Sequence, residues 1–464
     1  MSSGMEPPAA IKQLLRWDQL RQTSWGQRLT DNWVNIGMGV FLLLVTAWRF
    51  ASTWNESKKY KHSNRFLPAP NFPTINEQLD FDYTKTEPAQ LRPFKPKYHL
   101  TMGNHWPPEL PSADSPDSTD TDFPALENLN PDDLILMDKN YKSRLAYRRK
   151  ILAEHPDNTC AVTDDKRIHK AVAEYYTFLT GTYLPLRYPS MFKLHKTLYE
   201  TGEHFMLQNL ITGEMWPCFP LSSTISTYTL LMTLGKTLDE DILFLLPEEG
   251  TEETAEPKYV LHALITCFPS GFNPGLDKLG KRLADIHGPV PGYKAKLESS
   301  MDRYFAKLEV GKYVKRANWN ITHNTELYAA GSDTNHSHEG DEVEELKEID
   351  LEKTFLRTER QTLQRLPKSK AIVFSFKTYL YPISQIRDEG SGPALAEAIE
   401  GMKGGNTPGM YFYKRGAVWG EAVKRYLRGG GGDQKVVKEE VLQEVEKVKD
   451  HEGEVRLRRK GGGG

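Results

Sequence analysis

The sequence predicts an α+β fold in which an antiparallel sheet is covered on one face by helices. Two strand-like runs are followed by two helical stretches, and three further strand-like runs come after them. The strand-like runs are 241–247, 258–269, 312–323, 354–366 and 371–382, and the helical stretches are about 276–287 and 294–309. The same order of elements suits a sheet curved around a ligand pocket.

Amphipathic periodicity predicts helices before and after this sheet. The segment "LILMDKNYKSRLAYRRKILAEH", which starts at residue 134, indicates one helix, and a second is expected over 169–184. Residues 394–403 and 417–428 also have a helical pattern. The charged tail at 429–464 is either an exposed helix or disordered.

The N-terminal region predicts a membrane anchor. Residues 33–50, "WVNIGMGVFLLLVTAWRF", are almost free of charge and long enough to cross a bilayer as a helix. Because polar residues 1–32 precede this run and no clean cleavage site follows it, we favour an uncleaved single-pass anchor over a cleaved signal or a buried helix. Lys and Arg are more frequent after the run, which favours a cytosolic C-terminal domain. Residues 51–92 have the composition of a linker or extended arm.

Composition and motifs exclude several functional classes. The 464 residues include 60 Lys and Arg against 62 Asp and Glu, and the net charge of −2 gives no support to nucleic-acid binding. The three cysteines lie far apart, which argues against a disulfide framework, a zinc ribbon or a cysteine-bound iron–sulfur cluster. GxGxxG after a strand, GxxxxGK[ST], HExxH and GxSxG are all absent. Any redox chemistry must therefore receive its electrons from another protein.

The acidic segment 329–350 is expected to be a solvated loop. It also contains possible metal ligands, namely His336, His338, Glu339 and Asp341. The sequence shows no second shell of residues that would orient such ligands, so we favour the solvated loop.

His287 lies in the segment "LADIHGPVPG", at the predicted end of a helix. The Gly288-Pro289 step prevents the helix from continuing. A neutral histidine held there beside apolar side chains can bind a metal or haem iron through one ring nitrogen while the other nitrogen donates to a carbonyl. It can equally be a C-terminal cap that interacts with the helix dipole, and spacing alone leaves both interpretations open.

The strand-like run 354–366 carries an unusual number of polar residues. On a strand, one face would present Arg357, Glu359 and Gln361, and the other Thr358, Arg360 and Thr362. These residues could form a polar outer face with cross-strand ion pairs. Alternatively, they could form a pocket wall in which Glu359 or Arg360 handles protons or an oxygen-derived anion.

Several ordered motifs resemble those of the haem-dependent oxidative N-demethylase alpha-subunit-like family. They are "KLGKRLADIHGPVPG", "KRANWNITH" and "LRTERQTLQRLPKSKAIVFSFKTYLYPI", together with "GTYLPLRYPSMF", "EDILFLLP" and "CFPSGFNPGLDKLG". The resemblance extends over residues 93–428. It implies a PAS-like domain, an antiparallel sheet with flanking helices that binds haem b through one histidine.

The resemblance also implies an activity. The family's characterised bacterial system oxidises a secondary amine such as dimethylamine with O2 and releases formaldehyde, while flavin and iron–sulfur partners deliver electrons from NADPH. We therefore expect a haem-dependent monooxygenase or oxidative demethylase that needs a reductase or ferredoxin-like partner. The alternative is a PAS-like haem or small-ligand sensor without turnover.

The resemblance assigns roles to particular residues. His287 is the expected iron ligand. Arg316 and Asn318 of "RANW" are candidates for contacts with the haem, and Tyr379 is a weaker candidate that could equally be core. Glu359, Arg360 and Gln361 of "ERQ" are the candidate catalytic residues. The predicted anchor lies outside the family's common domain and suggests a larger or more apolar amine, such as one from a secondary-metabolite pathway.

Overall fold

The structure is a computed structural model that describes residues 66–94, 126–199, 202–219, 225–249, 257–331, 335–338, 340–404 and 407–430. These residues belong to one compact unit that begins at Phe66. The predicted anchor at 33–50 lies outside the described residues, as does the tail beyond Gly430, and both stay predictions. Across the described ranges, no helix is both long and apolar enough to cross a membrane.

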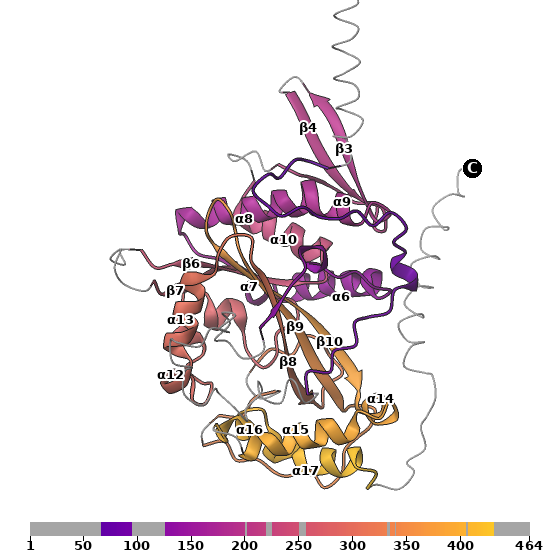
Figure 1. Cartoon of the computed structure of the whole chain (residues 1–464), viewed down its shortest axis with the longest axis vertical. Helices are drawn as coiled ribbons and strands as arrows, with labels where there is room; N and C mark the ends of the chain where they lie inside the picture. Colours follow the sequence, from indigo (N-terminus) through magenta and orange to yellow (C-terminus); the bar gives the residue numbers. More distant parts are fainter. Residues whose placement is uncertain are drawn as a thin grey trace, which may run out of the picture. The chain divides into compact units, whose positions relative to one another are not determined.

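A seven-stranded antiparallel sheet forms the centre of the unit (Figure 1). In spatial order its strands are β1 (Glu127–Asn128), β8 (Tyr313–Thr322), β9 (Phe355–Arg365), β10 (Ile372–Pro382), β6 (Asp241–Pro247), β7 (Tyr259–Ile265) and β2 (Cys160–Val162). All five strands predicted from the sequence are present, and β6 has the predicted bounds. The fold is therefore α+β, as predicted.

Helices cover both faces of the sheet, not one face as expected. The rear face packs on α6 (Tyr141–Glu154), α8 (Lys166–Phe178) and α10 (Thr227–Thr237), in one core cluster with Ile242 and Phe244 of β6. The front face packs on α11 (Leu283–Ile286), α12 (Tyr293–Lys296) and α13 (Glu298–Lys307), in a second cluster with Leu261 and Leu363. Two separate apolar cores therefore lie on opposite faces of one sheet, and a third apolar cluster packs around the ends of β8–β10.

The helical segment before α13 differs from its prediction. The expected helix over 276–287 is instead a π-turn, η5 (Pro274–Lys278), followed after a break by the single turn of α11. Gly280 lies in this break with a φ of 74°, a conformation that side-chain-bearing residues rarely adopt. The break leaves α11 as a short, separately positioned turn that ends at His287.

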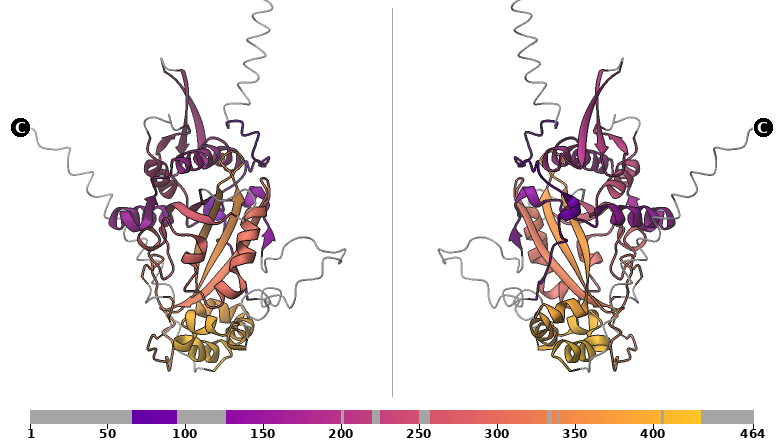
Figure 2. Two further views of the ribbon diagram at one scale, coloured as in Figure 1. Left: turned by 90° about the vertical axis from the view of Figure 1, so that its left-hand side faces the viewer. Right: turned by 90° about the vertical axis from the view of Figure 1, so that its right-hand side faces the viewer.

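Further elements surround the ends of the sheet (Figure 2). One helical group at the ends of β8–β10 comprises α14 (Ile383–Asp388), α15 (Gly392–Gly404), α16 (Gly409–Tyr413) and α17 (Gly416–Leu427). A small sheet of β3 (Phe192–Tyr199), β4 (Gly202–Asn209) and β5 (Met215–Pro217) includes a projecting hairpin. The short elements are η1 (Tyr83–Lys85), η3 (Pro131–Asp133), α7 (Pro156–Thr159), η4 (Leu179–Tyr183) and α9 (Leu184–Arg187).

The described part of the predicted arm lies against this unit. Leu67 and Ile75 are buried in the rear core, and Phe94 is buried against Trp319 near the ends of the strands. The amide of Leu67 donates to the carbonyl of Gly181 at 2.6 Å. Residues 66–94 are therefore an extended arm that contributes to the core.

Candidate functional site

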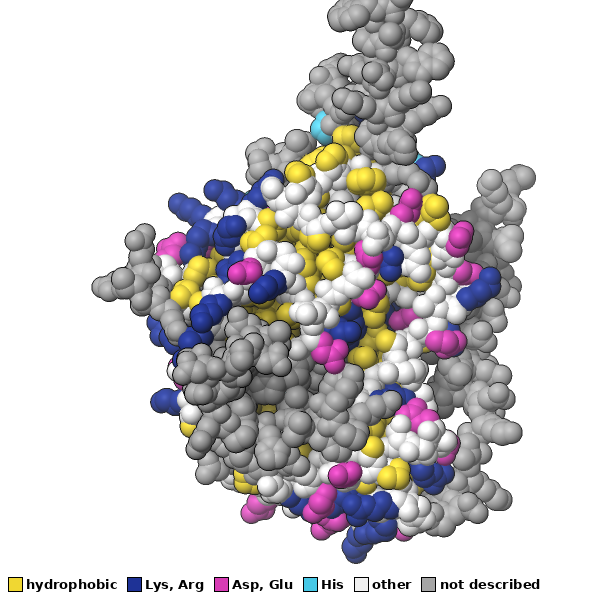
Figure 3. Space-filling view, viewed as in Figure 1, with side chains coloured by type: hydrophobic (Ala, Val, Ile, Leu, Met, Phe, Trp, Pro, Cys, Tyr) yellow, Lys and Arg dark blue, Asp and Glu magenta, His cyan; other side chains and the backbone are white. Residues whose placement is uncertain are grey.

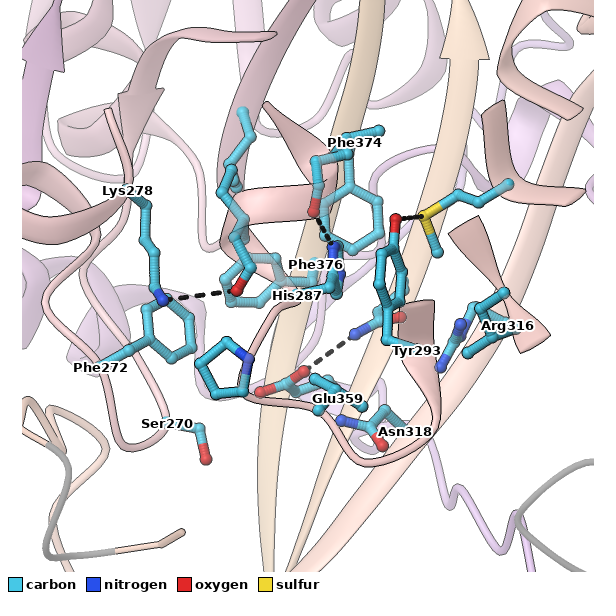
Figure 4. A pocket seen from close by; sticks show the side chains of 18 of the residues that line it. Ser270, Phe272, Lys278, His287, Tyr293, Arg316, Asn318, Glu359, Phe374 and Phe376 are labelled. Carbon is cyan, nitrogen blue, oxygen red and sulfur yellow. Dashed lines mark hydrogen bonds between the residues drawn. The ribbon is translucent and has the colours of Figure 1, made fainter. Parts of the chain in front are cut away.

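A cavity of about 500 Å³ lies between the front face of the sheet and the helical segment α11–α13. Its lining is mainly apolar and includes Phe374 and Phe376 of β10 together with Tyr293, Met301 and Tyr304 of the covering helices (Figure 4). This volume and composition are typical of sites for small molecules and cofactors. A pocket is therefore present against the sheet, as the order of elements suggested.

His287 lines the cavity at the end of α11. Its ring Nδ1 lies 2.8 Å from the carbonyl oxygen of Leu283, and the ring stacks on Tyr293 with 4.9 Å between centroids. Because a carbonyl can only accept, Nδ1 carries the proton and Nε2 keeps its lone pair in the neutral ring. Burial lowers the pKa of His287, and the positive charge of Arg316 acts in the same direction. Cap and ligand are thus compatible roles, since the cap interaction uses one nitrogen and leaves the other for an acceptor such as iron.

The register of β8 and β9 brings four predicted residues into the same cavity as His287. Arg316 is paired with Gln361 across the two strands, and Asn318 is paired with Glu359. Directly opposed residues of an antiparallel pair point to the same face. All four side chains line the cavity, and the amide of Gln361 donates to the Glu359 carboxylate at 3.0 Å (Figure 4).

Two other predicted residues lie away from this cavity. Arg360 alternates with Glu359 along β9, and its guanidinium donates to the backbone carbonyls of Asp133 and Leu134 behind the sheet. Tyr379 is buried in the core cluster at the ends of the strands and does not line the cavity. The period of two of a strand explains both placements. The geometry thus gives neither residue direct access to a ligand in the front cavity.

Lys414 is a cavity residue that sequence reasoning missed. It follows α16, is only 5% exposed, and its ammonium donates to the backbone carbonyl of Trp319 at 2.5 Å and to Asn318 Oδ1 at 3.3 Å. Burial, reinforced by the nearby positive charge of Arg316, lowers the pKa of Lys414 to about 7. The next residue, Arg415, has a φ of 60°, a strained conformation that often marks functional sites. The only sequence signal for Lys414 is a lysine directly after the segment "MYFY".

Two buried cations of this cavity, Arg357 and Lys414, and the half-buried Arg316 have no ion-pair partner among the described residues. Arg357 donates to the carbonyls of Leu327, Phe268 and Pro269, and neither its Nε nor that of Arg316 has a hydrogen-bond partner. Lys414 is the third cation. Burial is the main reason that the pKa of each of the three is lowered.

Glu359 is the one carboxylate in the described lining of the cavity. Buried charges are normally paired, since an uncompensated buried charge costs several kcal/mol. One carboxylate cannot balance three cations, so the cavity is suited to a ligand that carries negative charge.

The acidic segment 329–350 contributes to this cavity, which corrects the expectation that it is a wholly solvated loop. Asn335 and Ser337 are buried, and His336 lines the cavity with its ring stacked on Tyr413 at 4.5 Å. Burial, together with the charge of Lys414, lowers the pKa of His336 to about 4. The described residues contain no cluster of three His, Cys, Asp or Glu side chains that could hold a metal ion.

Fold and site together define a class: an α+β protein with a mainly apolar, cationic cavity, lined by a histidine whose Nδ1 is hydrogen-bonded to a backbone carbonyl. Residues 125–424 match the family model described as haem-dependent oxidative N-demethylase, alpha subunit-like. The chain belongs to this family. The matched residues lie within the expected 93–428 and include the whole cavity.

Proposed function

We propose that the protein is a haem-dependent oxygenase that removes an N-methyl group from an amine with O2 and electrons from partner proteins. The observation that carries the proposal is the arrangement of His287, whose Nδ1 is held by the Leu283 carbonyl and whose Nε2 is left for iron in a cavity of suitable volume. Such outer hydrogen bonds fix the tautomer and raise the basicity of metal-binding histidines.

The other residues of the cavity also suit haem b. Its porphyrin needs apolar walls, which Phe374, Phe376 and Met301 provide. Its two propionates need positive partners, and the free Nε atom of Arg316 and the ammonium of Lys414 can supply hydrogen bonds. The described lining carries several positive side chains against one carboxylate, Glu359, and this excess of positive charge suits the two negative propionates.

The same topology supports the PAS-like description. Two strands, a helical segment and three strands follow one another along the chain, and the last strand, β10, pairs with the first, β6. The helical segment α11–α13 then covers one face of the sheet and carries His287 at its start. We propose haem b as the cofactor on this basis.

In this proposal, haem supplies O2 binding and activation, and the chain supplies position and charge. When bound, haem would supply chemistry that inserts one oxygen atom of O2 into the C–H bond beside nitrogen, with two electrons and two protons converting the other atom to water. The resulting carbinolamine breaks down to the demethylated amine and formaldehyde. Glu359 is the group that can attract a protonated amine, and the Gln361 amide orients its carboxylate. A flavin or iron–sulfur partner must deliver the electrons, since the sequence has no motif for either function.

The proposal is tested by absorption spectroscopy of the protein purified after expression with haem supplied. We expect a Soret band that His287→Ala removes or shifts strongly. His336→Ala is the matched control because it removes another histidine ring of the cavity lining, and its band should stay unchanged. A colourless wild-type protein, or equal bands in all three proteins, would overturn the proposal.

A second measurement separates an oxygenase from a sensor or binding protein. With a reductase system, NADPH and dimethylamine as a probe amine, an oxygenase releases formaldehyde as O2 is consumed. A haem sensor binds O2 and forms no formaldehyde. A panel of larger N-methyl amines then tests whether the cavity accepts the bulkier substrates that the predicted anchor at 33–50 suggested.

The predicted anchor is a separate proposal, which rests on sequence alone. We propose that residues 33–50 hold the protein in a membrane with the described unit in the cytosol. Deletion of residues 1–50 should release the protein from the membrane fraction. Membrane association that survives this deletion would refute the assignment.

A further inference from the structure

The outer surface of the helical segment that closes the cavity is strongly basic. Between Lys278 and Lys312 the sequence has eight Lys and Arg against four Asp and Glu, whereas the whole chain has a net charge of −2. Asp302, one of the four acids, is buried in an ion pair with Lys258. Two of the eight cations also have ion-pair partners, Arg282 with Glu248 and Lys312 with Glu309, so the excess positive charge of the segment rests on the remaining ones.

The basic side chains lie on the side of the helices that faces away from the cavity. On α13, Met301, Tyr304 and Phe305 line the cavity, whereas Arg303 and Lys307 are exposed. Positions four apart share one face of a helix, so Arg303 and Lys307 lie on one exposed stripe. Lys281 before α11 and Lys294 on α12 are exposed as well. We call Lys281, Lys294, Arg303 and Lys307 the basic face.

The space-filling view agrees with this placement. Figure 3 shows Lys and Arg side chains gathered along the left edge of the molecule, where Figure 1 places α8, β6, β7 and α13. Lys166 and Lys170 at the start of α8 are also exposed and extend the positive surface. On the face shown, this edge therefore carries a positive patch.

Only one layer of helix separates the basic face from the cavity. The same helix, α13, has one side in the cavity lining and the other in solvent. An α-helix with its side chains is about 10–12 Å across. A redox centre held against the basic face would therefore lie within electron-tunnelling range of a cofactor bound beside His287.

We propose that the basic face is the docking surface for an acidic electron-transfer protein that reduces the cofactor in the cavity. This inference rests on the proposed function, because an electron-transfer partner is needed only if the cavity holds a redox cofactor. Charge complementarity of this kind accelerates association and makes it sensitive to salt. It fits a transient complex, in which the partner binds, transfers one electron and leaves.

The test measures binding of a plant-type [2Fe–2S] ferredoxin, used as an acidic probe, to the full chain at low and at raised ionic strength. We expect Kd to rise with salt, since screening weakens exposed charge pairs. The variant Lys281→Glu/Arg303→Glu/Lys307→Glu should bind about tenfold or more weakly. The control Lys142→Glu/Lys150→Glu/Lys193→Glu changes the net charge equally on exposed positions of α6 and β3, away from α13, and should bind within about twofold of wild type.

Three outcomes would overturn the proposal: no binding of the ferredoxin, equal weakening by the two triple variants, or tighter binding of anionic lipid vesicles than of ferredoxin at the basic face. The haem content of each preparation is read separately from its Soret band. A protein that binds ferredoxin at the basic face and holds no haem would refute the proposed function and leave the docking surface standing. A haem-loaded protein whose ferredoxin binding is weakened equally by the two triple variants would refute the docking surface and leave the proposed function standing.

Discussion

Replacement of Lys414 by methionine should stabilise the haem-free protein at neutral and mildly acidic pH. The lysine is 5% exposed and its ammonium has two hydrogen bonds but no carboxylate partner among the described residues. Burial and the charge of Arg316 lower the pKa of Lys414 from 10.5 to about 7. A long apolar side chain avoids the cost of burying this charge.

The size of the effect follows from this change in pKa. Between pH 7 and 10.5 the unfolded lysine keeps its proton while the folded one has lost it, so the unfolded state binds more protons and the free energy of unfolding rises with pH. The difference between the two pKa values corresponds to about 5 kcal/mol. Methionine leaves the Trp319 carbonyl without its donor, which costs about 1–3 kcal/mol. We therefore expect a net gain of about 2–4 kcal/mol at pH 6.

Urea denaturation of the full chain at pH 6, 8 and 10 measures this difference. The gain should shrink as pH rises, and near pH 10 the wild type should be the more stable protein. Lys142→Met, at an exposed position of α6, is the control and should show no such pH dependence. If Lys414→Met is less stable than wild type by the same amount at pH 6 and pH 10, the lysine is not a buried charge and the reasoning is wrong.

Three further predictions concern Glu240, Glu359 and Gly271. Burial raises the pKa of Glu240 from 4.5 to about 7, so the folded state binds more protons, and the free energy of unfolding should fall by about 3 kcal/mol as pH rises from 4.5 to 7. Urea titrations should show that Glu240→Gln abolishes this fall. The same pH dependence in the variant and the wild type would contradict the prediction. Glu359→Gln should raise KM for a cationic amine at least about tenfold and leave the Soret band intact, because one charge-assisted contact with the amine is lost. An unchanged KM would show that Glu359 does not bind the amine. A Cβ at Gly271 would clash with the ring of His336, and the φ of 77° strains any side chain there, so Gly271→Ala should lower stability by about 1–3 kcal/mol. Thermal unfolding equal to wild type would contradict both the clash and the strain.

The strands could be predicted because their signal is local. Runs such as "DILFLLP" are apolar, lie between turn residues and are buried on both faces of the sheet, and β6 has the bounds read from the sequence. The hairpin of β3 and β4 was missed because its sequence, "FKLHKTLYETGEHFMLQN", mixes charged and apolar residues without a clear period. Helix α10 was missed as well, because its threonines are poor helix formers.

The cavity residues were predictable only where the strand period could be combined with a motif. Glu359 and Gln361 were correctly placed on one face, and the opposite face of the same strand holds Arg360. Lys414 could not have been found in this way, because its burial depends on contacts with Trp319, which lies almost a hundred residues earlier. The burial of His336 depends in the same way on the packing of its ring against Tyr413.

The alternation of side chains along β9 also determines how the molecule can change. Glu359 lines the cavity, and its neighbour Arg360 donates hydrogen bonds from the rear of the sheet to the carbonyls of Asp133 and Leu134. Under the proposed function, a substitution of Glu359 would alter what the protein binds, whereas a substitution of Arg360 would remove hydrogen bonds that hold the rear of the sheet. New substrate preferences can therefore be selected on one side of this strand while the other side preserves the architecture, and neighbouring codons are exposed to different selective pressures.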